Sequence, residues 1–160
     1  MSRIERAVEK LGLQLPPTPK PVASYVPAIQ TGHYVHTSGQ LPIVNGKMVA
    51  TGIVGKDVTL EQGQEAAQAC VLNALAAIRS VIVDLEEISQ IVKMTVFIAS
   101  APDFSQQPEV ANGASHLLEK VFGDKGSHAR SAVGCSSLPR NAPVEVELTV
   151  EIHERVEFDK

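Results

Sequence analysis

The most regular pattern of apolar and polar positions in the chain lies between residues 144 and 152. Aliphatic residues at the even positions alternate with mostly acidic residues at the odd ones: Val144, Val146, Leu148, Val150 and Ile152 against Glu145, Glu147, Thr149 and Glu151. Because successive side chains of a strand point to opposite faces, this segment is predicted to be a strand with one buried and one acidic face. Residues 91–98 are mostly apolar and rich in β-branched side chains, which predicts an interior strand.

Three segments carry apolar residues at helical spacing. Residues 2–11 predict a short N-terminal helix, followed by a proline-rich linker. Thr59 and Gln62 have the spacing of a capping box, and behind them a long helix is predicted over residues 61–83. A further helix is predicted over residues 108–122.

Two hairpins are predicted in the first third of the chain. Residues 22–28 and 33–41 suit two antiparallel strands around a tight turn. Residues 43–49 carry Asn45-Gly46 between apolar runs, and this dipeptide favours a type I′ turn, which needs a positive φ at both central positions.

These elements follow one another in the order β-β-β-α-β-α-β-β, which predicts a two-layer α+β sandwich. The helices are expected to cover the aliphatic face of the sheet. The polar face is left without a cover, so it meets either water or further copies of the chain.

The composition limits the classes of protein to consider. With 160 residues, the chain is expected to hold an N-terminal helix and linker over residues 1–21 and one α+β domain over residues 22–160. A formal net charge of -4 and only 4% aromatic residues argue against nucleic acid as a partner. The N-terminus has no long apolar segment, so we expect neither a signal peptide nor a membrane helix, and a cytoplasmic protein.

Cysteine and histidine give few leads. Cys70 and Cys135 are far apart in sequence, which excludes a disulfide framework. Cys70 is expected to be an inert core residue, and a nucleophilic Cys135 has no evident base. The five histidines lack metal-ligand spacing, so no metal site is expected.

The segment 128–139, followed by residues 144–147, carries the strongest candidate chemistry. Arg130 stands at the start of a predicted strand, where its guanidinium can bind a carboxylate through two parallel hydrogen bonds. A glutamate of the following acidic strand can move a proton. The alternative is a structural ion pair, because such pairs also mark purely structural networks.

The chain resembles the RidA, or YjgF-type, family of reactive-intermediate deaminases, formerly labelled L-PSP endoribonucleases. The resemblance covers about residues 22–152, and the subgroup with an N-terminal extension is the most similar. It rests on an ordered set of short motifs: Ala23-Ser24-Tyr25-Val26-Pro27, Thr37-Ser38-Gly39-Gln40-Leu41-Pro42, residues 92–98, Asn112, Ala129-Arg130-Ser131-Ala132-Val133, Leu138-Pro139 and Val144-Glu145-Val146-Glu147.

This resemblance implies a chorismate-mutase-like fold and a homotrimer whose sheets form a central barrel. It implies active sites in clefts between subunits, which hydrolyse enamines and imines such as 2-aminoacrylate to 2-keto acids and ammonia without a cofactor. The substrate is thus a small imine or enamine, and neither a membrane nor nucleic acid is an expected partner.

The resemblance also assigns residues to roles. Arg130 matches the arginine that holds the substrate carboxylate, and Glu145 matches the glutamate that orients or activates water. Residues that line the pocket in the family match Tyr25, Ser38, Gly39, Asn112 and the backbone of Ala132. The family commonly has cysteine at the position of Ala132, and the loop of residues 134–137 also departs from the usual pattern, so the substrate specificity is left open.

Two other functions remain open at this stage. A non-catalytic trimer with a regulatory role would use Arg130 to hold a small carboxylate metabolite, but such a protein would not need Glu145. An endoribonuclease fits poorly with the net charge and the scarce aromatic residues.

Overall fold

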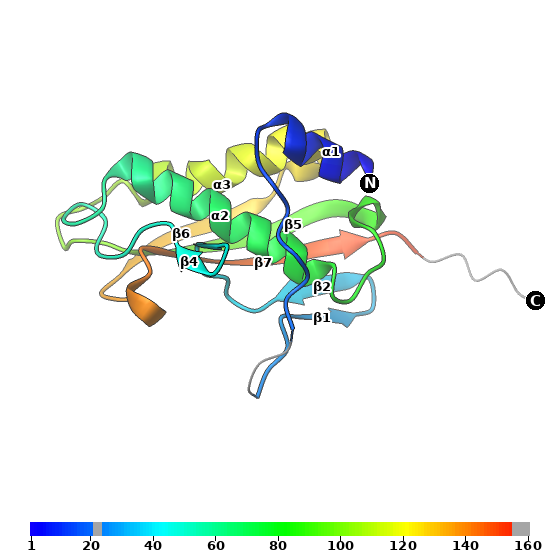
Figure 1. Ribbon diagram of the computed structural model, residues 1–160, viewed down its shortest axis with the longest axis horizontal. Coiled ribbons are helices and arrows are strands. Elements are labelled where there is room, and N and C mark those ends of the chain that lie inside the picture. Colours follow the sequence, from blue (N-terminus) through cyan, green and yellow to red (C-terminus); the bar gives the residue numbers. More distant parts are fainter. Residues whose placement is uncertain (21–23, 155–160) are drawn as a thin grey trace, which may run out of the picture.

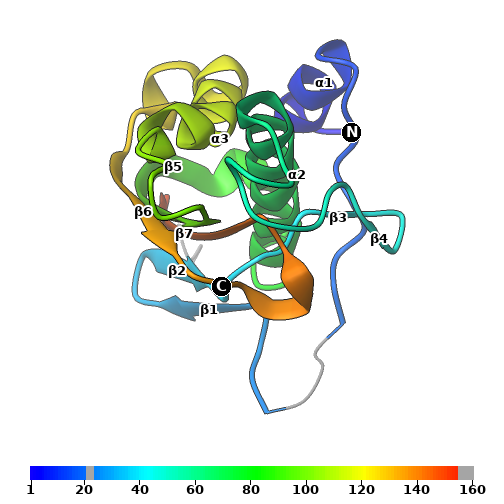
Figure 2. The same cartoon turned by 90° about the vertical axis from the view of Figure 1, so that its left-hand side faces the viewer.

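The fold consists of a five-stranded sheet with helices on one face, as Figures 1 and 2 show for the computed structural model. The structure describes residues 1–20 and 24–154, so the expected boundary between residues 21 and 22 lies outside the described residues. The helices are α1 (Arg3–Lys10), α2 (Leu60–Ile78) and α3 (Gln107–Phe122), with short 3-10 turns η1 (Leu85–Glu87), η2 (Gly123–Gly126) and η3 (Pro139–Asn141). The strands are β1 (Ala28–Thr31), β2 (Tyr34–Thr37), β3 (Ile43–Val44), β4 (Lys47–Met48), β5 (Ile88–Ala99), β6 (Ala129–Cys135) and β7 (Val144–Ile152).

The strand order in the sheet is β1-β2-β7-β5-β6. All neighbouring pairs are antiparallel except β5 and β6, which are parallel and joined through α3. The prediction for β7 is confirmed in its bounds and in its faces, because every even-numbered side chain of the strand is buried under the helices. The two-layer α+β architecture is likewise confirmed. The predicted order β-β-β-α-β-α-β-β is one strand short, because residues 43–48 form two strands, β3 and β4, and so four strands precede α2.

The long helix α2 is shorter than predicted. It begins after Thr59, whose hydroxyl accepts a hydrogen bond from the Gln62 amide while the Gln62 side chain accepts one from the Thr59 amide, so the capping box is confirmed. The helix ends at Ile78 and not at residue 83. The apolar residues beyond its end continue the helical spacing, but Ser80 donates its hydroxyl to the Ala77 carbonyl and the chain turns away.

The first hairpin is displaced from its predicted position. Its first strand is β1, which begins at Ala28 directly after Pro27, and residues 22–23 of the predicted strand lie outside the described residues. Proline lacks an amide proton, which suits a position just ahead of a strand. The small hairpin of β3 and β4 is confirmed, since Asn45 and Gly46 have φ values of 51° and 77°. It lies beside α2 and outside the main sheet (Figure 2).

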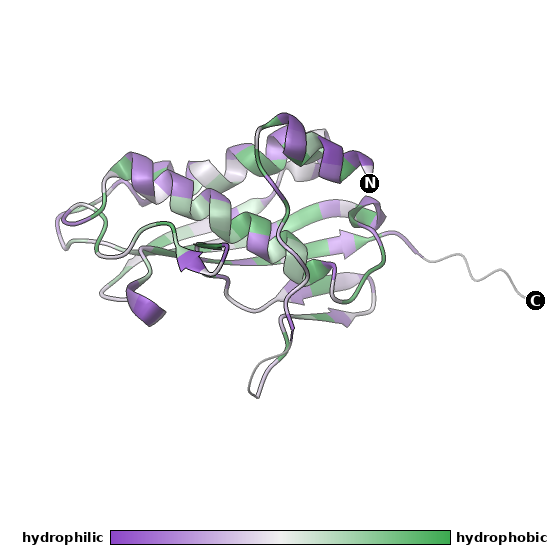
Figure 3. Ribbon diagram, viewed as in Figure 1, coloured by the Kyte–Doolittle hydropathy of each residue, from purple (hydrophilic) through white to green (hydrophobic). Residues whose placement is uncertain are grey.

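The N-terminal helix α1 packs on α3 and η1. Ile4 and Val8 are buried, and apolar bands interrupt the hydrophilic surface of α1 in Figure 3. The Arg79 guanidinium, at the end of α2, donates a 2.6 Å hydrogen bond to the Glu5 carboxylate. This extension is therefore part of the helical layer.

In the described part of the chain, the helices α1, α2 and α3 all lie on one side of the sheet and leave its other face open (Figure 1). Ile29 of β1, Tyr34 of β2 and Val133 of β6 are all more than 40% exposed. Only one chain is described, so the homotrimer and its central barrel stay predictions.

Candidate active site

Arg130 lies on β6, the strand at one edge of the sheet. Its backbone pairs with Met94, a core residue, so its side chain starts on the face that the helices cover. The guanidinium reaches α3 and donates hydrogen bonds from Nη1 to the Asn112 Oδ1 at 2.9 Å and to the Ser115 Oγ at 3.0 Å. Its Nη2 donates to the Pro108 carbonyl at 3.3 Å. Arg130 and Asn112, both predicted site residues, are therefore in direct contact.

All these partners of the Arg130 guanidinium are neutral. Among residues 1–20 and 24–154, no ion pair within 4.0 Å involves Arg130. Within these residues, Arg130 therefore does not take part in a structural ion pair. The side chain is fixed by hydrogen bonds while its positive charge remains available to an anion.

Glu145 lies on β7, on the open face of the sheet. Its backbone pairs with Phe97, which also pairs with Val133, so these side chains share the open face. Burial is the main cause that raises the pKa of the Glu145 carboxyl above its ordinary value, and the nearby Glu147 carboxylate raises it further.

Gly39 lies directly against the Glu145 carboxylate. A Cβ added at position 39 would collide with that carboxylate, so the close approach requires glycine. The neighbouring Ser38 is held by the loop before β1, because its amide donates to the Pro27 carbonyl at 2.8 Å and its hydroxyl to the Val26 carbonyl at 2.6 Å.

Tyr25 and Gly39 line one pocket of about 300 Å³, together with Lys20 of the proline-rich linker. The Tyr25 ring is largely exposed, with 66% of the residue accessible. Gly39 thus lies against Glu145, Ser38 precedes it in the chain, and Tyr25 shares a pocket with Gly39.

The predicted site residues consequently form two groups. Arg130 and Asn112 lie at the β6 edge under α3, and Ala132, on the same face of β6, packs against the core. Glu145 lies on the opposite face of the sheet with Gly39 against it, and Ser38 and Tyr25 belong to the segments beside Gly39. The chain alone does not bring the Arg130 guanidinium and the Glu145 carboxylate onto one face.

Cys135 follows on β6 and is partly exposed. Burial, and secondarily the Glu145 carboxylate, raises the pKa of its thiol. A raised pKa lowers the thiolate fraction, so the environment does not activate this cysteine as a nucleophile. Cys70 is fully buried in the core, as predicted, and its thiol contacts the Val144 carbonyl.

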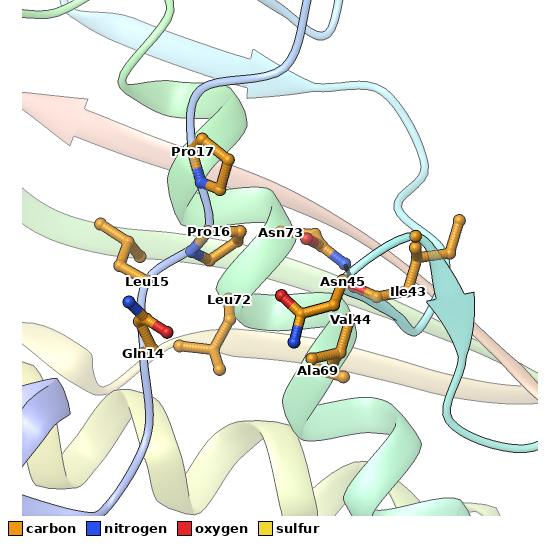
Figure 4. Close-up of a pocket in the computed structure, with 11 residues that line it drawn as sticks. Gln14, Leu15, Pro16, Pro17, Ile43, Val44, Asn45, Ala69, Leu72 and Asn73 are labelled. Atoms are coloured by element: carbon orange, nitrogen blue, oxygen red, sulfur yellow. Dashed lines mark hydrogen bonds between the residues drawn. The ribbon is translucent and has the colours of Figure 1, made fainter.

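Another pocket, of about 360 Å³, contains none of the predicted site residues (Figure 4). It lies between the N-terminal segment, the β3–β4 hairpin and α2, and its labelled lining includes Pro16, Val44, Leu72 and Asn73. The Asn73 amide there donates to the carbonyls of Leu41 and Ile43. Asn73 thus holds the backbone of residues 41–43 beside α2.

Within the described ranges, no group of three or more histidine, cysteine, aspartate or glutamate side chains is arranged to hold a metal ion. In the same residues, no helix is both long and apolar enough to cross a membrane.

Glu145→Gln is expected to raise Tm slightly at neutral pH. Because the folded-state pKa of this carboxyl lies above the unfolded-state value, ionised Glu145 destabilises the fold, and that cost is present in full above the folded-state pKa. The cost disappears below the ordinary pKa of 4.5, so the gain in Tm should vanish there. Thermal unfolding across the pH range measures this, with Glu65→Gln on the surface of α2 as the control. A gain that persists in acid would contradict it.

The fold is shared with known proteins. A crystal structure of Atu1372, a protein of unknown function from Agrobacterium tumefaciens, is 43% identical, with a TM-score of 0.90 over 94% of this chain and 93% of that one. Residues 16–152 match the family described as Endoribonuclease L-PSP. The chain belongs to this family, which is the RidA, or YjgF, family that its motifs indicated.

Two curated relatives extend the comparison. Protein TCP17 of Trypanosoma cruzi is 40% identical over 94% of this chain and 95% of its own length. A protein of Dermatophagoides farinae named 2-iminobutanoate/2-iminopropanoate deaminase is 30% identical over 88% of this chain and 94% of its own length.

Proposed function

We propose that the protein is a hydrolytic deaminase of small imines and enamines that carry a carboxylate, and that it converts them to 2-keto acids and ammonia. The observation that carries the proposal is the Arg130 guanidinium, which neutral groups hold in place and which no ion pair among the described residues neutralises. The relative named 2-iminobutanoate/2-iminopropanoate deaminase supports the reaction class.

The chemistry needs few groups. In a protonated imine the carbon is already electrophilic, so a positioned water and a carboxylate suffice. In the proposed reaction, Glu145 takes a proton from water as the water oxygen bonds to the imine carbon, which gives a carbinolamine. Glu145 then passes this proton to the nitrogen, and the C–N bond breaks as the hydroxyl oxygen forms the C=O bond. The hydroxyl proton returns to Glu145 and from there to ammonia, so the products are the keto acid and ammonium, and Glu145 is again a carboxylate. A raised pKa suits Glu145 to these proton transfers.

We place the complete site between two copies of the chain. Arg130 and Glu145 start from opposite faces of one sheet, so a copy packed on the open face and edge of its neighbour would bring one residue from each together. A surface for that contact is supplied by the exposed apolar residues on the open face and by the outer edge of β6, which pairs with no further strand among the described residues. The proposed assembly is a homotrimer.

The test is imine hydrolysis. 2-Aminoacrylate and larger imino acids are generated in situ, and the imine that survives is trapped with semicarbazide. The protein is expected to accelerate the loss of imine by about tenfold or more over buffer. The contrary result is a folded oligomer that binds 2-oxobutanoate but accelerates the loss of no imino acid. The protein would then be a carboxylate-binding protein and not a deaminase.

The family is described as Endoribonuclease L-PSP, so ribonuclease activity is a second function to test. Ribonuclease activity that survives repeated purification and disappears in Arg130→Ala would overturn the deaminase in favour of an endoribonuclease.

Gly39→Ala is expected to lower kcat about tenfold and to leave the fold intact. The new methyl would displace the Glu145 carboxylate, and a small misplacement of a catalytic group costs rate. The backbone tolerates alanine, since Gly39 is not among the glycines with positive φ. Gly63→Ala is the matched control, because the atoms nearest to its methyl would be side-chain carbons of Val110 and Val54. An unchanged kcat in Gly39→Ala would show that Glu145 takes no part in the reaction.

A further inference from the structure

A chain of hydrogen bonds runs from Arg130 into the protein through Ser115 and His128, two residues to which the sequence motifs assign no role. Ser115, a buried residue of α3, accepts from the Arg130 Nη1 at 3.0 Å and lies 2.9 Å from the His128 Nε2. The His128 Nδ1 lies 2.6 Å from the Gly126 carbonyl oxygen. Each polar atom in this chain has its partner inside the protein.

The directions of these bonds follow from which atoms carry hydrogen. A carbonyl oxygen only accepts, so the proton of His128 must lie on Nδ1. In a neutral imidazole the Nε2 then accepts, and its donor is the Ser115 hydroxyl. The Ser115 hydroxyl donates to His128 and accepts from Arg130. Neither Ser115 nor His128 therefore directs a hydrogen atom at the guanidinium.

We propose that His128, acting through Ser115, is a positioning residue that holds Arg130 for the substrate carboxylate. The inference rests on the proposed function and names a determinant of substrate binding in the same site. A carboxylate in the place of His128 could also orient Ser115, but it would offset the positive charge that the substrate needs. A neutral imidazole fixes the geometry and leaves the full charge of Arg130 for the ligand.

Two substitutions at one position separate this role from a structural one. Asparagine places an amide NH₂ near the former Nδ1, so His128→Asn can keep the bond to the Gly126 carbonyl and loses the acceptor for Ser115. Glutamine is longer and places a carbonyl oxygen near the former Nε2, so His128→Gln keeps the acceptor and loses the other bond. We expect His128→Asn to raise KM for imino acids about fivefold with kcat unchanged, and His128→Gln to remain near wild type.

Two measurements that need no turnover accompany the kinetics. Nitrogen NMR of the His128 ring, in mildly alkaline buffer, should show the proton on Nδ1. Calorimetric titration with 2-oxobutanoate should show weaker binding to His128→Asn and to Ser115→Ala by a similar factor of about five. Thermal unfolding checks that each variant is folded.

The outcomes divide cleanly. A normal KM for His128→Asn together with a lower Tm for His128→Gln would show a structural role and overturn the proposal, as would a proton on Nε2. If the wild-type protein hydrolyses no imine but binds 2-oxobutanoate in a His128-dependent way, the deaminase fails and the positioning role stands. If it does neither, both proposals fail.

Discussion

Arg130→Ala is expected to lower kcat/KM for 2-iminobutanoate by about 10²–10³-fold, through a loss of substrate binding as well as of turnover. The guanidinium is held by Asn112, Ser115 and the Pro108 carbonyl, so it does not have to be ordered when the substrate arrives. Alanine removes both the charge and the planar fork that pairs with a carboxylate. Steady-state kinetics with trapped imine measure the effect.

Two controls sharpen this result. Arg130→Lys keeps a positive charge but cannot reproduce the fork, so its kcat/KM should lie between those of the wild type and the alanine variant. Arg6→Ala removes an exposed arginine of α1 and should change nothing, since the Arg6 guanidinium donates to the Met1 carbonyl at the surface, far in sequence from the proposed site. An unchanged kcat/KM in Arg130→Ala would exclude the proposed carboxylate site.

Mixing two inactive variants is expected to restore activity. Arg130→Ala chains keep Glu145, and Glu145→Gln chains keep Arg130. A site shared between copies is therefore intact wherever a Glu145→Gln chain supplies Arg130 and its neighbour, an Arg130→Ala chain, supplies Glu145. In an equal, random mixture about three quarters of the trimers are mixed and each holds one intact site, which gives about a quarter of wild-type activity. The assay follows unfolding and refolding of the mixture.

Differently tagged chains and native mass spectrometry would establish that mixed trimers form. If they form and activity does not return, Arg130 and Glu145 act within one chain, and the placement of the site between copies is wrong. A doubly substituted chain, Arg130→Ala with Glu145→Gln, mixed with either single variant should give no recovery.

Much of the fold could be predicted because the signals are local. The alternation in β7 and the capping box before α2 each depend on residues a few positions apart, and the structure confirms them. The end of α2 could not be predicted from periodicity, because apolar residues such as Ile82 continue the pattern beyond the helix and are buried in the same core.

The division of the site into two groups could not be read from the sequence. Arg130 and Glu145 lie on different strands, and whether they share a face depends on how β5 aligns with both neighbours. A shift of one residue in either alignment would reverse the answer. The link between Ser115 and His128 was likewise hidden, since it joins a helix to the residue just before a strand.

The position of β6 at the edge of the sheet also matters for the fate of an unassembled chain. An edge strand leaves a row of backbone groups free to pair with another molecule, and outward charges usually discourage such pairing. Here the charged residue of β6, Arg130, is turned toward α3, while Val133 is 44% exposed. Newly made chains therefore carry a template for uncontrolled strand addition, and productive assembly and aggregation compete for the same edge.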